Sequence, residues 1–298
     1  MFFESLFSDR SRRAGVLLHI SSLPCRHGIG DLGPNAHAFA ETLAAAGLEY
    51  WQFLPLTPTS AFIGSSPYSS PSAFAGNPLF ISPEYLLEDG FISQAELEMS
   101  LDAHLPGEWQ QTGEPPRQAR GAVLDNHGRV DFEAVSAQRE FLLNAAFDLL
   151  LEKGIEPANL PGFKEFTSES GYWLEDYALF AALKEAHGGA GWLQWPDELK
   201  WRDPASLESR RGAHRNSVER QKFIQYLFNR QWNRLHERCR SLGVSLVGDM
   251  PIYVTHDSAE VWTRPDLYHL GPNGEPTVVA GVPPDYFSET GQRWGNPV

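Results

Sequence analysis

The sequence predicts a parallel α/β fold, because two short apolar runs flank an amphipathic helix near the start of the chain. The first run, residues 16–20, has the unbroken apolar character of a strand that is buried on both faces of a sheet. A helix is expected over 34–46, since Pro34 suits a first helical turn and Gly47 suits a helix stop. The second run, residues 50–55, completes a strand–helix–strand unit of the kind that builds parallel sheets.

This alternation is interrupted in the middle of the chain and resumes near its end. Residues 107–120 form a polar stretch that is typical of a linker. The clearest central helix is expected over 172–186, where aromatic and leucine side chains recur at helical spacing. A long helix is expected over 217–242 with Asn216 as its N-cap, and residues 244–249 are expected to form a third buried strand. The chain thus supplies about three strands, whereas an α/β barrel needs eight.

Composition excludes several classes of partner. The chain has 298 residues, of which 42% are hydrophobic and 21% are charged, as in globular proteins. Its 24 Lys and Arg against 38 Asp and Glu give a formal charge of −14, which argues against nucleic acid and anionic membranes as main partners. No apolar run approaches the roughly 20 residues that span a bilayer, and residues 1–13 lack the apolar stretch of a signal peptide. We therefore expect a cytoplasmic protein with no membrane partner.

A glycine-rich segment offers one functional hypothesis. Residues 28–33 match the G-x-G-x-x-G pattern of dinucleotide-binding loops and lie between a predicted strand and a predicted helix. In such loops the glycines follow the strand directly, whereas here residues 21–27 intervene and the helix begins only at Pro34. The acidic residue that would bind a ribose should follow the second strand, yet Glu49 precedes it. A plain glycine-rich turn is the favoured interpretation, and a nucleotide-dependent oxidoreductase is the alternative.

Three other segments could carry chemistry. Residues 65–78 combine serine, proline and aromatic side chains, which suits either a surface loop or a rigid loop at the carboxyl end of a strand. Asp249 ends the third predicted strand, where a carboxylate either caps a turn or binds a ligand. Residues 282–297 hold aromatic side chains between prolines and glycines, which is consistent with an ordinary anchored loop or a movable lid. Aromatic rings can meet the apolar faces of sugars.

The histidines and the two cysteines do not have the sequence spacing of known metal-binding motifs, so no metal and no cofactor is expected.

Together these segments resemble a known family, the 4-alpha-glucanotransferases, also called amylomaltases or disproportionating enzymes, of the alpha-amylase clan. The resemblance runs from the first predicted strand to the last residue. Its most specific parts are GDMPIYVTHDSAEVW and VAGVPPDYFSETGQRWGNP. The segments that carry it are LLHISSLP with GIGDLG (17–33), YWQFLPLTPT (50–59), SPYSSPSAFAGNP (66–78), WLEDYALFAALKEAHGG (173–189), GDMPIYVTHDSAEVW (248–262) and VAGVPPDYFSETGQRWGNP (279–297).

The resemblance implies an α/β fold of the (β/α)8 TIM-barrel type with inserted helical subdomains, of which this chain holds about the first three strands. It divides the chain into the start of the catalytic barrel (1–58), one or more insertion subdomains (59–215) and a barrel continuation with a lid loop (216–298). It also implies retaining transfer of α-1,4-glucan segments between maltooligosaccharides, starch-derived or glycogen-derived dextrins, without metal or cofactor. Such chemistry uses a close pair of carboxylates.

The resemblance also implies roles for individual residues. The nucleophile and the acid/base carboxylate belong to segments beyond Val298, so no catalytic carboxylate pair is expected within 1–298 and the chain looks truncated there. Asp249 matches a supporting active-site carboxylate. The matching substrate-binding positions are Tyr68, expected to stack on the sugar, Ser66 beside it, Asp249, the acceptor clamp Asp285, Tyr286 and Phe287, and the supporting Trp294 and Asn296. Ser65 stands where many relatives have Asp. An inactive fragment that only binds malto-oligosaccharides is the alternative to the transferase.

Overall fold

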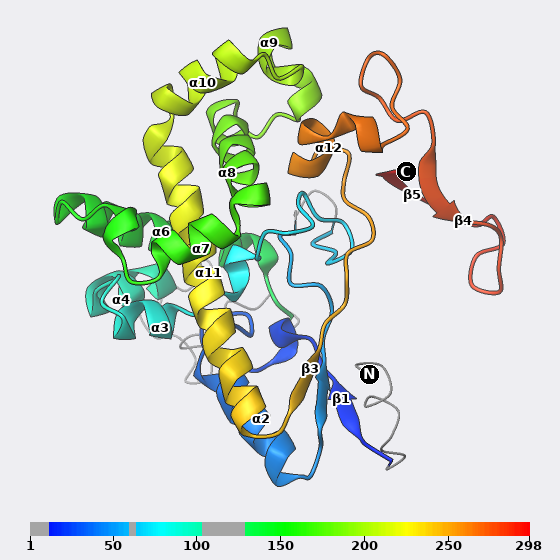
Figure 1. Ribbon diagram of the computed structural model, residues 1–298. Coiled ribbons are helices and arrows are strands. Elements are labelled where there is room, and N and C mark those ends of the chain that lie inside the picture. Colours follow the sequence, from blue (N-terminus) through cyan, green and yellow to red (C-terminus); the bar gives the residue numbers. More distant parts are fainter. Residues whose placement is uncertain (1–11, 60–63, 103–128) are drawn as a thin grey trace, which may run out of the picture.

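A short parallel sheet forms the base of the molecule (Figure 1). The computed structural model describes residues 12–59, 64–102 and 129–298, so the predicted linker 107–120 lies outside the described residues. Within them, strands β1 (Gly15–Leu17), β2 (Tyr50–Gln52) and β3 (Ser245–Val247) pair in parallel in the order β1-β2-β3. Helix α2 (Pro34–Ala45) connects β1 to β2. The predicted strand–helix–strand unit is confirmed.

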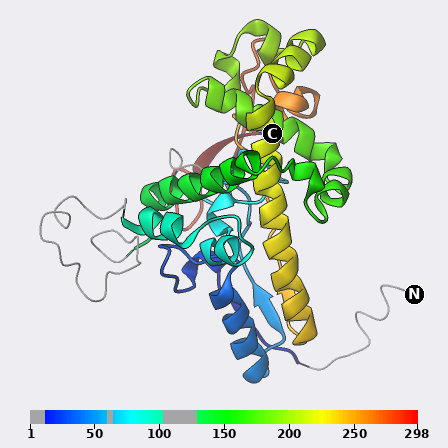
Figure 2. The ribbon, with the colours of Figure 1, turned by 90° about the vertical axis from the view of Figure 1, so that its left-hand side faces the viewer.

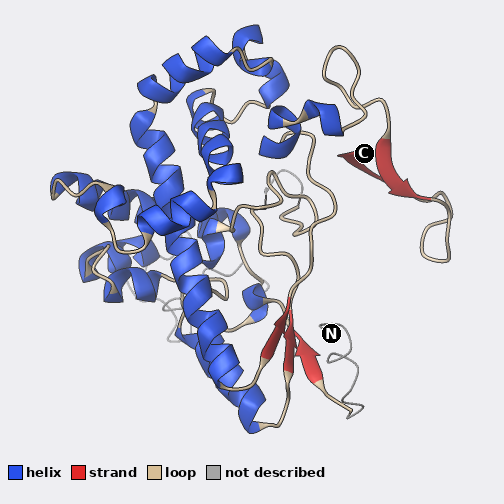
Figure 3. Ribbon diagram, in the orientation of Figure 1, coloured by secondary structure: helices blue, strands red, loops and turns tan. Residues whose placement is uncertain are grey.

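The prediction that the first strand is buried on both faces is wrong, and so is the burial expected of the third strand. Val16, Trp51 and Leu246 are aligned across the sheet and pack in the same core as α2. The next residues along each strand point to the opposite face, where Leu17 is 60% exposed and Val247 is 38% exposed. This second face is open because the described chain covers the sheet only on the side of α2 and α11 (Figure 3). The outer edges of β1 and β3 pair with no further strand among the described residues. Apolar runs in the sequence identified the strands but could not reveal that one face is uncovered.

The 27-residue helix α11 (Arg215–Ser241) organises the fold, and Figure 2 shows that it extends along most of the molecule. Its first turns contribute Val218 to a tryptophan-rich core and Phe223 to a helical core, and its last turns contribute Leu235 and Cys239 to the core beneath the sheet. The helix begins at Arg215 with His214 as its N-cap residue, so the prediction of Asn216 as the N-cap is wrong. Gly243, with a φ of +74°, follows the helix as expected of a stop residue.

The central region is helical, and its helices pack on both sides of α11. Helix α8 (Gly171–Ala186) matches the predicted helix 172–186 and buries Tyr177, Phe180 and Leu183. The other α-helices are α3 (Pro83–Glu88), α4 (Gln94–Asp102), α6 (Phe132–Glu152), α7 (Phe163–Glu169), α9 (Asp197–Lys200), α10 (Pro204–Ala213) and α12 (Ala259–Thr263). Short 3₁₀ turns are η1 (Ile20–Ser22), η3 (Pro78–Phe80), η4 (Pro157–Asn159), η5 (Trp192–Gln194) and η6 (Pro265–Leu267).

The region that was expected to form a loop, residues 282–297, belongs to a β-hairpin. Strands β4 (Val279–Val282) and β5 (Gln292–Pro297) pair in antiparallel fashion and lie apart from the parallel sheet (Figure 1). Alternation of apolar and polar residues is weak in both strands, and prolines and glycines interrupt them, which explains why the sequence pattern did not predict them.

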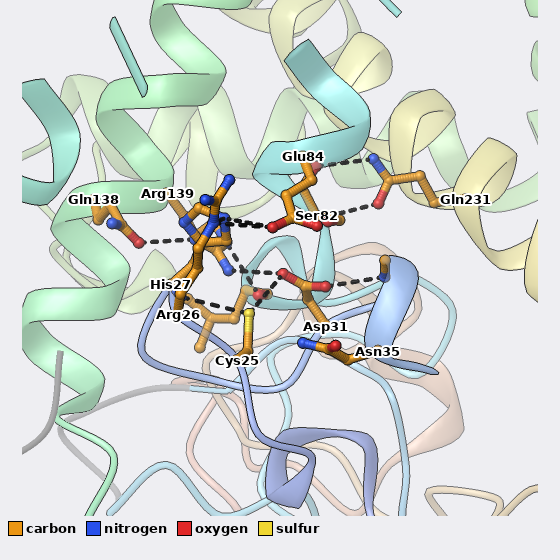
Figure 4. Close-up of polar contacts among 12 residues, drawn as sticks. Cys25, Arg26, His27, Asp31, Asn35, Ser82, Glu84, Gln138, Arg139 and Gln231 are labelled. Carbon is orange, nitrogen blue, oxygen red and sulfur yellow. Dashed lines mark hydrogen bonds and ion pairs between the residues drawn. The ribbon is translucent and has the colours of Figure 1, made fainter. Parts of the chain in front are cut away.

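The glycine-rich segment 28–33 is a buried structural turn, which overturns the dinucleotide hypothesis. All six residues are buried, and a side chain at Gly30 would collide with the carbonyl oxygen of Ile20. The carboxylate of Asp31 accepts a hydrogen bond of 2.9 Å from the amide of Gly33. It also pairs with the buried guanidinium of Arg139 on α6 at 3.3 Å (Figure 4). The amide that would meet a phosphate therefore already has a carboxylate partner.

A buried histidine beside this turn predicts acid sensitivity. His27 is fully buried, and burial together with the nearby Arg139 and Arg26 lowers its pKa to about 3, although Glu84 lies 3.6 Å away. The pKa of His27 is about 3 in the folded chain and has its ordinary value of 6.5 in the unfolded chain. Between these two pH values the unfolded chain binds a proton at His27 that the folded chain does not bind. We expect the free energy of unfolding to fall by about 2 kcal/mol for this group between about pH 7 and pH 5.

Urea unfolding at the two pH values measures this effect. The variant His27→Gln, which cannot take up the proton, should show a correspondingly smaller loss between them. An equal loss in both proteins would contradict the assignment to His27.

Candidate active site

The loops that follow β2 and β3 form an open pocket together with β5. Because β2 and β3 are parallel neighbours, their carboxyl ends point to the same edge of the sheet, where α/β proteins bind ligands. The pocket has a volume of about 460 Å³. Its lining residues are Ser66, Tyr68 and Ser69 from the loop after β2, Asp249, Met250, Pro251, Ile252 and Tyr253 from the segment after β3, and Trp294 and Asn296 from β5.

Tyr68 and Asp249 meet in this pocket although they are 181 residues apart in the chain. The hydroxyl of Tyr68 donates a hydrogen bond of 2.8 Å to Oδ2 of Asp249. This bond to a carboxylate raises the pKa of the Tyr68 phenol, so the phenol stays protonated and remains a donor. Half of the Tyr68 side chain is exposed, which leaves its ring accessible to a ligand. The pair thus offers an aromatic face, a carboxylate and a hydroxyl at one place.

The loop that carries Tyr68 has an unusual backbone. Ser66 Oγ accepts a hydrogen bond of 3.3 Å from the amide of Tyr68, which fixes a tight turn. The preceding Ser65 has a φ of +53°, in the left-handed region that serine seldom adopts and that Asn and Asp adopt more readily.

Trp294 and Asn296 form the side of the pocket that comes from β5. The Asn296 side chain is buried, and its Nδ2 donates to the carbonyl oxygen of Val254 at 2.9 Å, so it joins β5 to the segment that follows Asp249. The Trp294 ring is half-exposed and lies edge-on to Tyr253, with 6.1 Å between the ring centroids. Together they present an amphipathic wall beside Asp249.

The other three predicted residues lie outside this pocket. Asp285, Tyr286 and Phe287 occupy the turn of the β4–β5 hairpin, where Asp285 Oδ1 accepts hydrogen bonds from the amides of Phe287 and Ser288. Tyr286 is 97% exposed and Phe287 is 89% exposed. The structure therefore brings together five of the eight predicted residues and holds the other three on an exposed turn.

Sequence reasoning missed the apolar lining of the pocket. Met250 and Ile252 are 80% and 86% exposed, and both line the pocket, so they add accessible apolar surface beside Asp249. Both lie just after Asp249 in a Pro-containing segment with no regular structure, so their alternation with Pro251 and Tyr253 was the only available signal.

Within the residues that the structure describes, no group of three or more His, Cys, Asp or Glu side chains could hold a metal ion. No helix in that part of the chain is long and apolar enough to cross a membrane.

Comparison with known proteins decides the family. The sequence profile of the 4-alpha-glucanotransferases matches residues 18–298, which is nearly the whole chain. This chain belongs to the 4-alpha-glucanotransferase family. The recognition of that family from the sequence is confirmed.

Individual relatives agree with this assignment. The chain is 45% identical to the 4-alpha-glucanotransferase of Thermus thermophilus and 41% identical to that of Aquifex aeolicus, over 96% of this chain and 52% of each relative. Its structure is similar to that of an amylomaltase from Streptococcus agalactiae in complex with acarbose, with a TM-score of 0.80 and 35% identity over 97% of this chain and 53% of that one. The chain thus spans about half the length of the relatives that it matches.

Proposed function

We propose that the pocket between Tyr68, Asp249 and Trp294 binds an α-1,4-glucan, and that the complete protein transfers glucan segments between maltooligosaccharides. The observation that carries this proposal is the direct contact between Tyr68 and Asp249 in an open pocket of a chain from this family. Sugars combine apolar ring faces with hydroxyl edges, so a site for them needs aromatic faces beside hydrogen-bonding groups. The similar amylomaltase structure that contains acarbose, a sugar-like ligand, supports the same substrate class.

In this proposal the chain forms the first strands of a (β/α)8 barrel, with inserted helices over 59–215 between a start at 1–58 and a continuation at 216–298. The open edge of β3 and the exposed apolar Leu17 and Val247 support it, because further strands would cover them. The position of the pocket at the carboxyl ends of the strands also supports it, since barrel enzymes have their active sites there.

The pocket as described favours binding over catalysis by this chain alone. Asp249 is the one carboxylate among the described residues that line it. Retaining glycoside chemistry needs two carboxyl groups roughly 5 Å apart, one as nucleophile and one as acid and then base. We therefore propose that residues 1–298 hold part of the glucan and that both catalytic carboxylates come from outside them. A chain of these 298 residues would then be an inactive malto-oligosaccharide-binding fragment.

Maltotriose tests the transferase proposal. Protein expressed from the complete reading frame should convert two maltotrioses into glucose and maltopentaose, because transfer of a maltosyl unit conserves the number of glycosidic bonds. Residues 1–298 alone should bind maltotriose without forming either product. Transfer by residues 1–298 alone would contradict the proposed location of the carboxylates, and its absence from the complete protein would contradict the transferase.

The exposed hairpin turn should control the fate of the sugar. We propose that Tyr286 and Phe287 clamp the acceptor sugar over the pocket and exclude water. Their 97% and 89% exposure and the contact between their rings, with 5.6 Å between the centroids, support this, because the two rings form one accessible patch. Replacing both by alanine in the complete protein should lower the ratio of transfer to hydrolysis by about tenfold, or about 1.4 kcal/mol.

The ratio can be measured as maltopentaose formed against reducing ends gained from maltotriose. The matched control is Tyr172→Ala, which removes an aromatic side chain that is 75% exposed on α8 and is absent from the pocket lining. An unchanged ratio in the Tyr286 and Phe287 variant would rule out the clamp.

A further inference from the structure

A carboxylate outside the pocket holds the loop on which Tyr68 lies. Glu260, on helix α12, is 188 residues from Ser72 in the sequence, yet its Oε1 accepts a hydrogen bond of 2.7 Å from Ser72 Oγ. The same oxygen accepts a second bond, of 2.9 Å, from the amide of Ala73. The other oxygen, Oε2, is buried and has no hydrogen-bond partner among the described residues. Burying a carboxylate whose second oxygen has no such partner costs free energy, which the two hydrogen bonds to Oε1 offset only in part.

By accepting the proton of Ser72 Oγ, Glu260 orients a hydroxyl that organises the loop. Ser72 is fully buried, and its Oγ accepts hydrogen bonds of 3.2 Å from the amides of Phe74 and Ala75 while it donates to Glu260. Without an acceptor at Glu260, the buried hydroxyl of Ser72 and the partly buried amide of Ala73 would lose their partner. Each such loss costs about 1–3 kcal/mol. Glu260 therefore fixes the backbone over residues 72–75.

This fixed backbone connects directly to the pocket. Ser70, two residues after Tyr68, forms a bridge with Val254, and the amide of Thr255 donates to the carbonyl oxygen of Ser70 at 2.9 Å. The amide of Ala259 donates to the carbonyl oxygen of Pro71 at 3.0 Å. The segment that begins at Asp249 and ends at Glu260 is thus attached to the loop of Tyr68 along its length.

We propose that Glu260 is a positioning residue of the glucan pocket, which holds the loop 68–75 so that the Tyr68 hydroxyl meets Asp249. Glu260 is absent from the pocket lining, so it acts on a ligand only through this loop. Its effect on sugar binding rests on the proposed function of the pocket. Its effect on the loop does not.

Four versions of the chain test this role: the unchanged protein, Glu260→Ala, Glu260→Gln and the control Val261→Ala. Gln retains the oxygen that accepts from Ser72 and Ala73, and Val261→Ala removes fully buried methyl groups from the same helix without removing a hydrogen bond to the loop. Hydrogen exchange without sugar should be faster by about tenfold or more over residues 68–75 in Glu260→Ala, and close to the unchanged rate in Glu260→Gln. Should Glu260→Ala fail to fold, Ser72→Ala is expected to give the same acceleration.

Acarbose titration separates positioning from general destabilisation. Glu260→Ala should weaken acarbose binding by about tenfold in the unchanged chain and by less than about twofold when Tyr68 is already Phe, because the two side chains act through one contact. Exchange over 68–75 that is no faster than in Val261→Ala, or equal weakening in both backgrounds, would overturn the proposal. If the unchanged chain binds no acarbose while the exchange behaves as expected, the sugar function fails and the role of Glu260 in the loop stands.

Discussion

Replacing Arg139 by Met is expected to lower the free energy of unfolding by about 3–5 kcal/mol, because it leaves the carboxylate of Asp31 buried without its counter-charge. Both side chains are buried, at 1% and 4% exposure, and Nη2 of Arg139 lies 3.3 Å from Oδ2 of Asp31. Burial raises the pKa of Asp31 and lowers that of Arg139, and each partner opposes the shift of the other. Arg139 also donates to the side-chain oxygen of Gln138 and to the carbonyl oxygen of Leu79, so several groups lose partners at once.

A matched control is available on the surface. Arg238 pairs with Glu41 at 2.6 Å, but both side chains are about half exposed, so Arg238→Met should cost less than about 1 kcal/mol. Urea unfolding of the two variants beside the unchanged chain measures the difference. Equal costs would mean that the Asp31–Arg139 pair contributes no more than a surface pair.

The second large effect is expected at Asp249. Asp249→Ala should weaken acarbose binding by roughly 10- to 100-fold, since a hydrogen bond to a charged group contributes about 1.5–3 kcal/mol. It should also release the Tyr68 hydroxyl, whose partner is Oδ2 of Asp249. Tyr68→Phe keeps the ring and removes only that donor, so a smaller loss is expected than for Tyr68→Ala.

Titration calorimetry of each variant with acarbose provides the measurement. Asp266→Ala is the control, because that carboxylate pairs with Arg264 on the surface and is absent from the pocket lining. If Asp249→Ala bound acarbose as tightly as Asp266→Ala, Asp249 would have no part in binding.

Local signals in the sequence were sufficient for the framework of the fold. Pro34 and Gly47 delimit α2, and the aromatic repeat of α8 predicts which side chains are buried, since both depend on near neighbours in the chain. Features that depend on residues far apart in the chain could not be predicted from such local signals. The apolar strands carry no mark of whether a second layer covers them, and the β4–β5 hairpin lacks the alternation that identifies strands.

The site shows the same division. Asp249 was noticed because it ends an apolar run, and the family resemblance named its companions. That Tyr68 donates to Asp249, or that Glu260 holds Ser72, follows from contacts between segments more than 180 residues apart, for which one sequence contains no rule. The glycine pattern at 28–33 was ambiguous, because a buried turn and a phosphate loop both need glycines where the backbone is crowded, and the favoured interpretation as a plain turn is the one that the structure shows.

Hydrogen exchange of the chain with and without saturating acarbose tests whether the pocket beside Asp249 is the glucan site, because it locates the ligand as well as detecting it. We expect slower exchange over 66–70 and 249–254, the two segments that form the pocket with β5. A second pocket, lined by Arg139 and Arg220 among other residues and located elsewhere on the molecule, should be unaffected. Protection at that second pocket alone, or no protection at 66–70 and 249–254, would contradict the assignment of the pocket beside Asp249 as the glucan site.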